Sequence, residues 1–149
     1  MAERDNALTL TLVNHASEIE RACALVERFV EHRNLSPEVA YVVSLTLDEV
    51  VANVIRHGYD DGAEHAIRIH VDLDGDLLTV RVEDDGREFN PLLAPVPDFD
   101  LPLEERPVGG LGIHIMRTLM DDIEYRRVDG ANVLTLRKRV NRTDPGTIA

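Results

Sequence analysis

The stretch LTLDEVVANVIRHGY, residues 45–59, places Glu49 and Asn53 four residues apart. On a helix this spacing puts both side chains on one stripe, about 6 Å apart. The amide oxygen of Asn53 is a hard ligand suited to Mg²⁺, which keeps most of its waters and binds phosphate groups. The carboxylate of Glu49 could accept a proton from an attacking hydroxyl or water. The alternative is a solvated polar flank, which a Glu-x-x-x-Asn spacing taken alone more often means.

A second candidate site follows a strand in VRVEDDGREFNP, residues 80–91, where Asp84-Asp85-Gly86 ends the apolar alternation. A carboxylate can accept a hydrogen bond from an exocyclic amine such as that of adenine. Gly86 would allow a flat ligand to approach closely, and Phe89 would either wall such a pocket or cap the core. The alternative is a simple strand-ending turn, for which Asp and Gly are favoured.

A third candidate is VGGLGIHIMRTLMD, in which Gly109, Gly110 and Gly112 open an apolar-striped helix. Free backbone N–H groups and the helix dipole make such a start an anion site. The alternative is a hinge for the preceding loop. The stretch is not a Walker P-loop, because no Gly-Lys-Ser/Thr follows, and it lacks the strand and ribose-binding acid of a dinucleotide fold.

The periodicity of the chain predicts five strands and three helices around these candidates. Hairpin signals imply a largely antiparallel sheet, and the apolar helix stripes imply that the helices cover one face of it. The opposite face would be polar, with Arg68, His70, Thr79 and Arg81. The expected fold is therefore α+β, a two-layer sandwich with a mainly antiparallel five-stranded sheet and three helices on one face. The expected strands are 7–14, 66–75, 77–86, 123–128 and 132–139, and the expected helices are 17–34, 36–58 and 111–122.

Local signals set the expected helix ends and domain limits. Ser17 and Glu20 have capping-box spacing, and Ser36 precedes Pro37 as an N-cap would. The proline-rich segment that follows the second hairpin is long for a compact domain, which favours a functional lid. We expect one domain over residues 1–140, with a lid at 90–109 and a flexible tail at 141–149.

Composition narrows the function classes. The 149 residues are 44% hydrophobic and 30% charged, as in soluble globular domains. The net charge of −12 argues against direct nucleic-acid binding. The sequence shows neither a secretory signal nor an apolar run long enough for a membrane span. Cys23 is the single cysteine, which fits a cytoplasmic location, and its apolar surroundings predict a place in the core.

In order along the chain, the three motifs resemble those of the GHKL (Bergerat-fold) ATP-binding superfamily. The compact domain that starts with a strand and two helices is similar to the anti-sigma factor serine/threonine-protein kinase branch. LTLDEVVANVIRHGY, VEDDGREFNP and GGLGIHIMRTLMDDIEY carry this resemblance, which covers residues 8–139.

The resemblance implies a role for each matching residue. Glu49 would be the general base, and Asn53 would bind the Mg²⁺ that bridges the ATP phosphates. Asp84 would pair with the adenine amine, and Gly86 would make room beside it. His57 would have a structural role. The phosphate-binding backbone would be that of Gly110, Leu111 and Gly112.

The same resemblance implies the reaction and the partners. The γ-phosphoryl group of ATP would pass to a serine or threonine of a STAS-domain anti-anti-sigma protein. The unphosphorylated antagonist would release a sigma factor, and its phosphorylation would free the kinase to hold that factor. The family habit is a homodimer. The resemblance as a whole implies a cytoplasmic partner-switching regulator without membrane contact.

Two features depart from the family pattern. Glu88 stands where many members have a second glycine, and no lysine lies near the lid to clamp the γ-phosphate. Phosphoryl transfer needs such positive charge, so Arg106 is the candidate for this catalytic role, ahead of Arg87. These departures keep open an alternative, a non-catalytic module that regulates a protein partner by binding ATP or ADP. An intact histidine kinase is not expected, because no helix with a phospho-acceptor precedes the domain.

Overall fold

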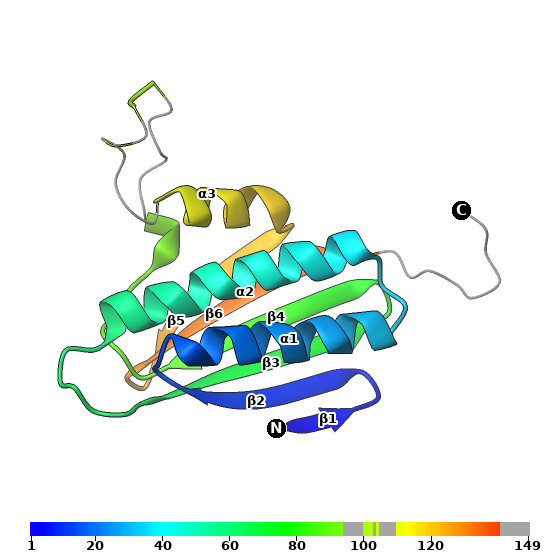
Figure 1. Cartoon of the computed structure of the whole chain (residues 1–149), viewed down its shortest axis with the longest axis horizontal. Coiled ribbons are helices and arrows are strands. Elements are labelled where there is room, and N and C mark those ends of the chain that lie inside the picture. Colours follow the sequence, from blue (N-terminus) through cyan, green and yellow to red (C-terminus); the bar gives the residue numbers. More distant parts are fainter. Residues whose placement is uncertain (94–99, 103, 105–109, 141–149) are drawn as a thin grey trace.

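The computed structural model describes residues 1–93, 100–102, 104 and 110–140 of the chain. In these residues, three α-helices lie on one face of an antiparallel sheet with the strand order β1-β2-β3-β4-β6-β5 (Figure 1). The predicted α+β two-layer sandwich is therefore confirmed. The helices are α1 (Ser17–His32), α2 (Pro37–Gly58) and α3 (Gly110–Leu119), and the strands are β1 (Ala2–Arg4), β2 (Ala7–Val13), β3 (Ala66–Asp74), β4 (Leu77–Asp84), β5 (Asp122–Val128) and β6 (Ala131–Arg139).

The described part of the sheet has six strands rather than the expected five, because β1 was missed. This strand has only three residues, and it pairs antiparallel with the start of β2, with Ala2 opposite Thr9. Three residues are too few to show a period of two, and two of the three are charged. Its pairing with β2 makes it the edge strand on that side.

The sheet contributes one face to a single apolar core. Alternate side chains of β2, β3, β4 and β6 point toward the helices, as the period of two requires. The buried ones among them are Leu8, Leu10, Leu12, Ile67, Ile69, Val71, Leu73, Leu78, Val80, Val82, Leu134 and Leu136. At one end of β4 and β6 this inward phase is occupied by Asp84 and Asn132, which face each other across the two strands. Two polar side chains therefore lie at the edge of the core.

The first helix starts differently from the expectation. Its N-cap is Ala16, which makes no side-chain capping bond, so the predicted Ser17 capping box is wrong. The Glu18 carboxylate instead accepts a hydrogen bond from the backbone N–H of Val13, at 3.2 Å. The helix ends at His32, two residues before the expected limit, and Asn34 follows with a φ of 59° that closes a Schellman-type turn. The N–H of Leu35 reaches back to the carbonyl of Val30, at 3.3 Å.

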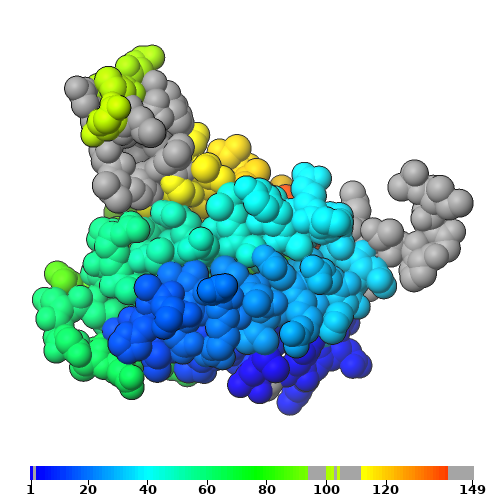
Figure 2. All heavy atoms as spheres, viewed as in Figure 1, coloured from blue at the N-terminus to red at the C-terminus, as the bar shows by residue number. Residues whose placement is uncertain are grey.

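The second helix begins as the sequence predicted. The Ser36 hydroxyl accepts a hydrogen bond from the N–H of Val39 at 3.2 Å, and Pro37 occupies the first helical position. Ser36 comes directly after the turn that ends α1, so the two helices lie side by side. Figure 2 shows the side chains of α1 and α2 forming a continuous surface over this face of the molecule. Cys23 is half-buried between them, and its thiol donates to the carbonyl of Ser44 at 3.6 Å.

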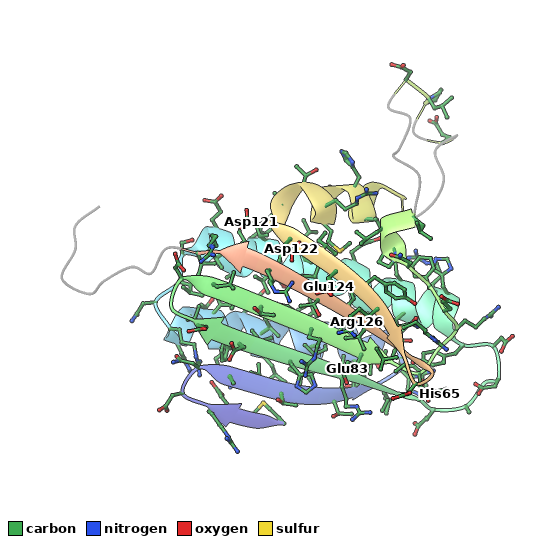
Figure 3. All side chains as sticks on the ribbon, turned by 180° about the vertical axis from the view of Figure 1, so that it is seen from behind. His65, Glu83, Asp121, Asp122, Glu124 and Arg126 are labelled. Atoms are coloured by element: carbon green, nitrogen blue, oxygen red, sulfur yellow. The ribbon has the colours of Figure 1, made fainter. Side chains whose placement is uncertain are left out.

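The other face of the sheet is open and polar, as expected. Arg68 and Arg81 are exposed there, and His70 and Thr79 are half-buried. The view from behind shows charged side chains, among them Glu83, Glu124 and Arg126, lying along this face (Figure 3). None of the helices in the described part of the chain is long and apolar enough to cross a membrane.

Candidate functional site

The second helix brings Asn53 to the wall of a cavity and places Glu49 one turn before it. Val50 and Val51 bury the core side of α2, which leaves Glu49 half-buried and Asn53 only 4% exposed. The Oδ1 atom of Asn53 accepts a hydrogen bond from the guanidinium of Arg56, at 3.2 Å. These three side chains follow one stripe of the helix, since positions i, i+4 and i+7 share a face. The stripe therefore carries a carboxylate, an amide oxygen and a cation in that order.

The third helix lies against the Glu49 carboxylate. A β-carbon on Gly112 would overlap that carboxylate, so only glycine fits while Glu49 keeps this position. Ile113 and Met116 are buried and anchor α3 over α2. One carboxylate oxygen of Glu49, Oε1, is buried and has no hydrogen-bond partner among the described residues. The first turn of α3 and the predicted general base are therefore brought together, and the base carries an unsatisfied oxygen.

The fourth strand ends in Asp84, whose carboxylate is held by two donors. Its Oδ1 accepts from the N–H of Gly86 and from Nδ2 of Asn132, both at 2.9 Å. Burial raises the pKa of Asp84, and these two hydrogen bonds act against that rise. Since both bonds use Oδ1, Oδ2 is the oxygen that can accept a hydrogen bond from a ligand.

Gly86 meets a constraint that the sequence did not reveal. A β-carbon there would lie 2.8 Å from the Cα of Gly58 and 2.9 Å from its carbonyl oxygen. The N–H of Arg87 donates to that same carbonyl at 2.9 Å. The turn after β4 is therefore pressed against the end of α2, and the missing side chain makes room for this backbone.

Asn132 and Tyr125 complete the hydrogen-bond network, and sequence analysis missed both. The Tyr125 hydroxyl donates to Oδ1 of Asn132 at 2.5 Å, and the N–H of Phe89 donates to the same atom at 3.3 Å. Two donors on Oδ1 fix the amide so that Nδ2 faces Asp84 and the carbonyl of Arg87, 2.7 Å away. The sequence does carry a signal for Asn132. On β6 it is two residues before Leu134 and four before Leu136, so its side chain must point to the same, inward face.

Between these groups lies a cavity with mostly apolar walls. The ring of Phe89 forms part of the wall and stacks on His57, with centroids 4.8 Å apart, which gives His57 a structural contact. Asn53, Asp84 and Asn132 supply convergent polar groups, as small-molecule sites do. The described lining residues are Val50, Asn53, Val54, Gly58, Val82, Asp84, Arg87, Phe89, Pro91, Tyr125, Asn132 and Leu134.

Some predicted site residues are only partly described. The backbones of Gly110 and Leu111 belong to the first turn of α3. Arg106 and Gly109 lie outside the described residues, as does most of the predicted lid. Arg87 lines the cavity, and its guanidinium is 3.5 Å from the carboxylate of Asp60.

The donor set fits the groups that the motifs imply. Among the described residues, no cluster of three His, Cys, Asp or Glu could hold a metal by itself. The buried amide oxygen of Asn53 offers one hard ligand, which suits a Mg²⁺ that takes its other ligands from phosphates and water. The apolar walls and the available Oδ2 of Asp84 are the groups that recognition of a flat base with an exocyclic amine requires.

Comparison with known proteins agrees with this geometry. Residues 12–138 match the family described as the histidine kinase-like ATPase domain. The chain belongs to this family. Among the relatives of this ATPase domain is the serine/threonine-protein kinase BtrW of Bordetella bronchiseptica, 27% identical over 86% of this chain and 90% of that protein. Another is the serine-protein kinase RsbW of Bacillus cereus, 33% identical over 62% of this chain and 59% of that protein.

Solved structures support the fold of this ATPase domain. The RsbU and RsbW domains of Rv1364c from Mycobacterium tuberculosis superpose with a TM-score of 0.66 at 16% identity, covering 91% of this chain and 32% of that one. The family match confirms the ATP-binding superfamily, and the names of BtrW and RsbW agree with the kinase branch that the three motifs resembled. The roles of individual residues stay predictions.

Proposed function

We propose that this protein is a Mg²⁺- and ATP-dependent serine/threonine protein kinase. The observation that carries the proposal is the contact between Glu49 and Gly112, one helical turn from Asn53, which lines the same cavity as the buried Asp84. A base-binding end and a phosphate-binding end are thus combined in one site. The names of BtrW and RsbW, both protein kinases of serine or threonine, support the same reaction class.

At the base end, Oδ2 of Asp84 would accept a hydrogen bond from the adenine amine. Asn132 supports this role because it donates to Oδ1 and leaves Oδ2 for the ligand. The apolar cavity walls would cover the two faces of the ring. A guanine presents a carbonyl at this position, so the ionised carboxylate would reject it.

At the phosphate end, Asn53 would hold Mg²⁺, which neutralises phosphate charge when bound. The backbone N–H groups of the first turn of α3, from Gly110, Leu111 and Gly112, would face the phosphates. Glu49 would accept the proton of the substrate hydroxyl as its oxygen bonds to the γ-phosphorus and the bond to the β–γ bridging oxygen breaks. Its unsatisfied Oε1 supports this role, since a buried acceptor without a donor is costly.

The structure adds a candidate for the catalytic cation. Sequence analysis placed this role on Arg106, which lies outside the described residues, and less on Arg87. Arg56 is a further candidate because its guanidinium already donates to Asn53 Oδ1. When Mg²⁺ occupies that oxygen, the Arg56 side chain would be released toward the phosphates.

The biological setting follows from the kinase branch. We propose that the substrate is a STAS-domain anti-anti-sigma protein and that the second partner is a sigma factor, in a partner-switching system. The active form would be a cytoplasmic homodimer. Residues 1–140 would form the single ATP-binding domain, with a lid over 90–109 and a tail at 141–149.

The test is a transfer assay with Mg-ATP and the STAS-domain protein encoded nearest to this chain. Mass spectrometry should find one phosphorylated serine or threonine on that partner. Glu49→Gln should abolish transfer while nucleotide still binds, and Glu31→Gln, on the exposed side of α1, is the matched control. Well-folded protein that binds ATP but transfers no phosphate would contradict the kinase. If Glu49→Gln leaves partner regulation intact, the chain is the non-catalytic nucleotide-binding module.

A further inference from the structure

His65 lies between two carboxylates next to the adenine-binding turn. Its Nε2 is 2.7 Å from Oδ2 of Asp61, and its Nδ1 is 3.2 Å from Oδ1 of Asp85. A neutral imidazole carries one N–H and can donate to only one of them. Acceptors at both ring nitrogens therefore select the doubly protonated cation. Figure 3 shows His65 at the end of the sheet where β3 begins.

The imidazole is held from several sides. The N–H of His65 donates to Oδ1 of Asn14 at 2.9 Å, and the ring stacks on Tyr59 with centroids 4.3 Å apart. Burial and the nearby Asp84 and Asp85 raise the pKa of Tyr59, so the phenol stays neutral. An aromatic face favours a cation over it. The His65 side chain is 20% exposed, which keeps solvent screening of its ion pairs partial.

The ionisation of His65 follows from the same contacts. The hydrogen bond to Asp61 is the main cause that raises the pKa of His65, burial acts against it, and the hydrogen bond to Asp85 adds to the rise. A His whose pKa is raised keeps its charge at and below its ordinary value, about 6.5. The cation is lost only as the pH climbs through the raised pKa.

The link to the nucleotide site is Asp85, which lies between Asp84 and Gly86 in the chain. On one side, this turn is fixed by Asn132, which donates to Asp84, and by Arg127, which donates to the carbonyl of Gly86 at 2.7 Å. On the other side, the Asp85 carboxylate contacts the ring of His65, and the phenol of Tyr59, whose pKa this carboxylate raises, lies nearby. Loss of the contact with His65 would remove the cation that holds Asp85, so the direction of the neighbouring Asp84 carboxylate would be less restricted.

We propose that the protonated His65 is a positioning residue for the nucleobase. By clamping Asp61 to Asp85, it ties the α2–β3 connection to the turn that carries Asp84. Adenine binding therefore becomes weaker as the pH rises through the titration of His65. This role rests on the proposed nucleotide-binding function. The remaining charged groups around the connection are paired with each other, Glu64 with His15 at 3.6 Å and Asp60 with Arg87 at 3.5 Å.

The test measures binding of adenosine and ADP by calorimetry between about pH 6 and about pH 9, a range that spans a raised His titration. Adenosine carries no phosphate, so it reports on the base end alone. The wild type should bind adenosine about threefold to fivefold more tightly at the low end of this range, the size expected for partly exposed ion pairs. His65→Gln should lose this advantage and show a flat profile.

The matched control is His70→Gln, a histidine on the open face of the sheet that pairs with Thr9. It should keep the wild-type profile. A wild-type profile in His65→Gln would overturn the positioning role. If the wild type binds neither adenosine nor ADP, the proposed function fails and the positioning role with it, whereas intact binding with no pH dependence overturns the positioning role alone.

A second variant keeps the imidazole in place and tests the clamp directly. In Asp85→Asn, NMR titration of the His65 ring should show a pKa below that of the wild type, because one of its two carboxylates has become neutral. The adenosine profile should shift to lower pH by the same interval. An unchanged His65 titration in a folded Asp85→Asn protein would overturn the clamp, even if His65→Gln does not fold.

Discussion

The two ends of the nucleotide site differ in how completely their polar groups are paired. At the base end, Asp84, Asn132 and Tyr125 form a continuous hydrogen-bond network, with distances of 2.5–2.9 Å between successive groups. At the phosphate end, Oε1 of Glu49 is buried without a described partner, and Asn53 is bound to an exposed arginine. The base end is thus built before the ligand arrives, whereas the phosphate end needs the ligand to satisfy its groups.

This difference gives the base end and the phosphate end different roles in nucleotide binding. A preorganised base end gives affinity and specificity at little cost in ordering. The unsatisfied Oε1 of Glu49 is an unfavourable feature that a donor, such as a substrate hydroxyl, would relieve. Substitutions at the two ends should therefore have different effects on stability and on chemistry.

The largest expected difference comes from the two glycines. In Gly86→Ala the new β-carbon meets the fixed backbone of Gly58, and overpacking of this kind costs about 3 kcal/mol of unfolding free energy. In Gly112→Ala it meets a movable carboxylate, and the better helix propensity of alanine offsets about 1 kcal/mol. Urea denaturation should show a large loss of unfolding free energy for Gly86→Ala and not for Gly112→Ala. Gly112→Ala should stay folded but lose phosphotransfer, because Glu49 is displaced. Equal losses of stability would contradict the contrast.

A smaller loss is expected when the base-end network is broken. Asn132→Ala removes a donor from Asp84 and the acceptor of Tyr125, and leaving such groups unpaired costs about 2 kcal/mol. Adenosine affinity should fall about tenfold if about 1.4 kcal/mol of that cost appears in binding. Thr135→Ala, on the open face of the same strand, is the control for thermal unfolding and calorimetry. Normal adenosine binding in Asn132→Ala would mean that Asp84 does not need this support.

The smallest effect is expected for Arg56 at the phosphate end, because its side chain is exposed. Arg56→Gln should weaken ATP binding about fivefold and leave ADP binding nearly unchanged, since a single exposed cation contributes up to about 1 kcal/mol. Arg68→Gln on the open sheet face controls for net charge. Equal weakening of ATP and ADP would place Arg56 away from the γ-phosphate, and no change at all would remove it from the site.

The sequence predicted those parts of the structure that have a repeating or motif-based signal. The period of two located β2, β3, β4, β5 and β6, and the Ser36-Pro37 pair located the start of α2. Strand β1 was missed because three residues show no period. The Ser17 capping box failed because Glu18 satisfies a donor in β2 instead, a tertiary contact that local spacing does not encode.

The candidate site was predictable to a similar degree. Glu49, Asn53 and Asp84 stand out because polar groups at helix spacing or at a strand end are visible in one segment. Asn132 and Tyr125 were missed because their meaning depends on β6 pairing with β4, 48 residues away from Asp84. His65 was missed for the same reason. The two carboxylates that contact it belong to Asp61, before β3, and to Asp85, after β4. The contact of Gly86 with Gly58 likewise depends on how helix and sheet pack.

The position of β6 between β4 and β5 has a consequence for synthesis on the ribosome. The strand that supplies Asn132 is the last of the described sheet and inserts between two strands made earlier. A nascent chain that has emerged only as far as β5 already carries Glu49, Asn53, Asp84 and Gly112, yet Asp84 has no amide to orient it. The hydrogen-bond network around Asp84 can therefore be completed only after translation has passed β6.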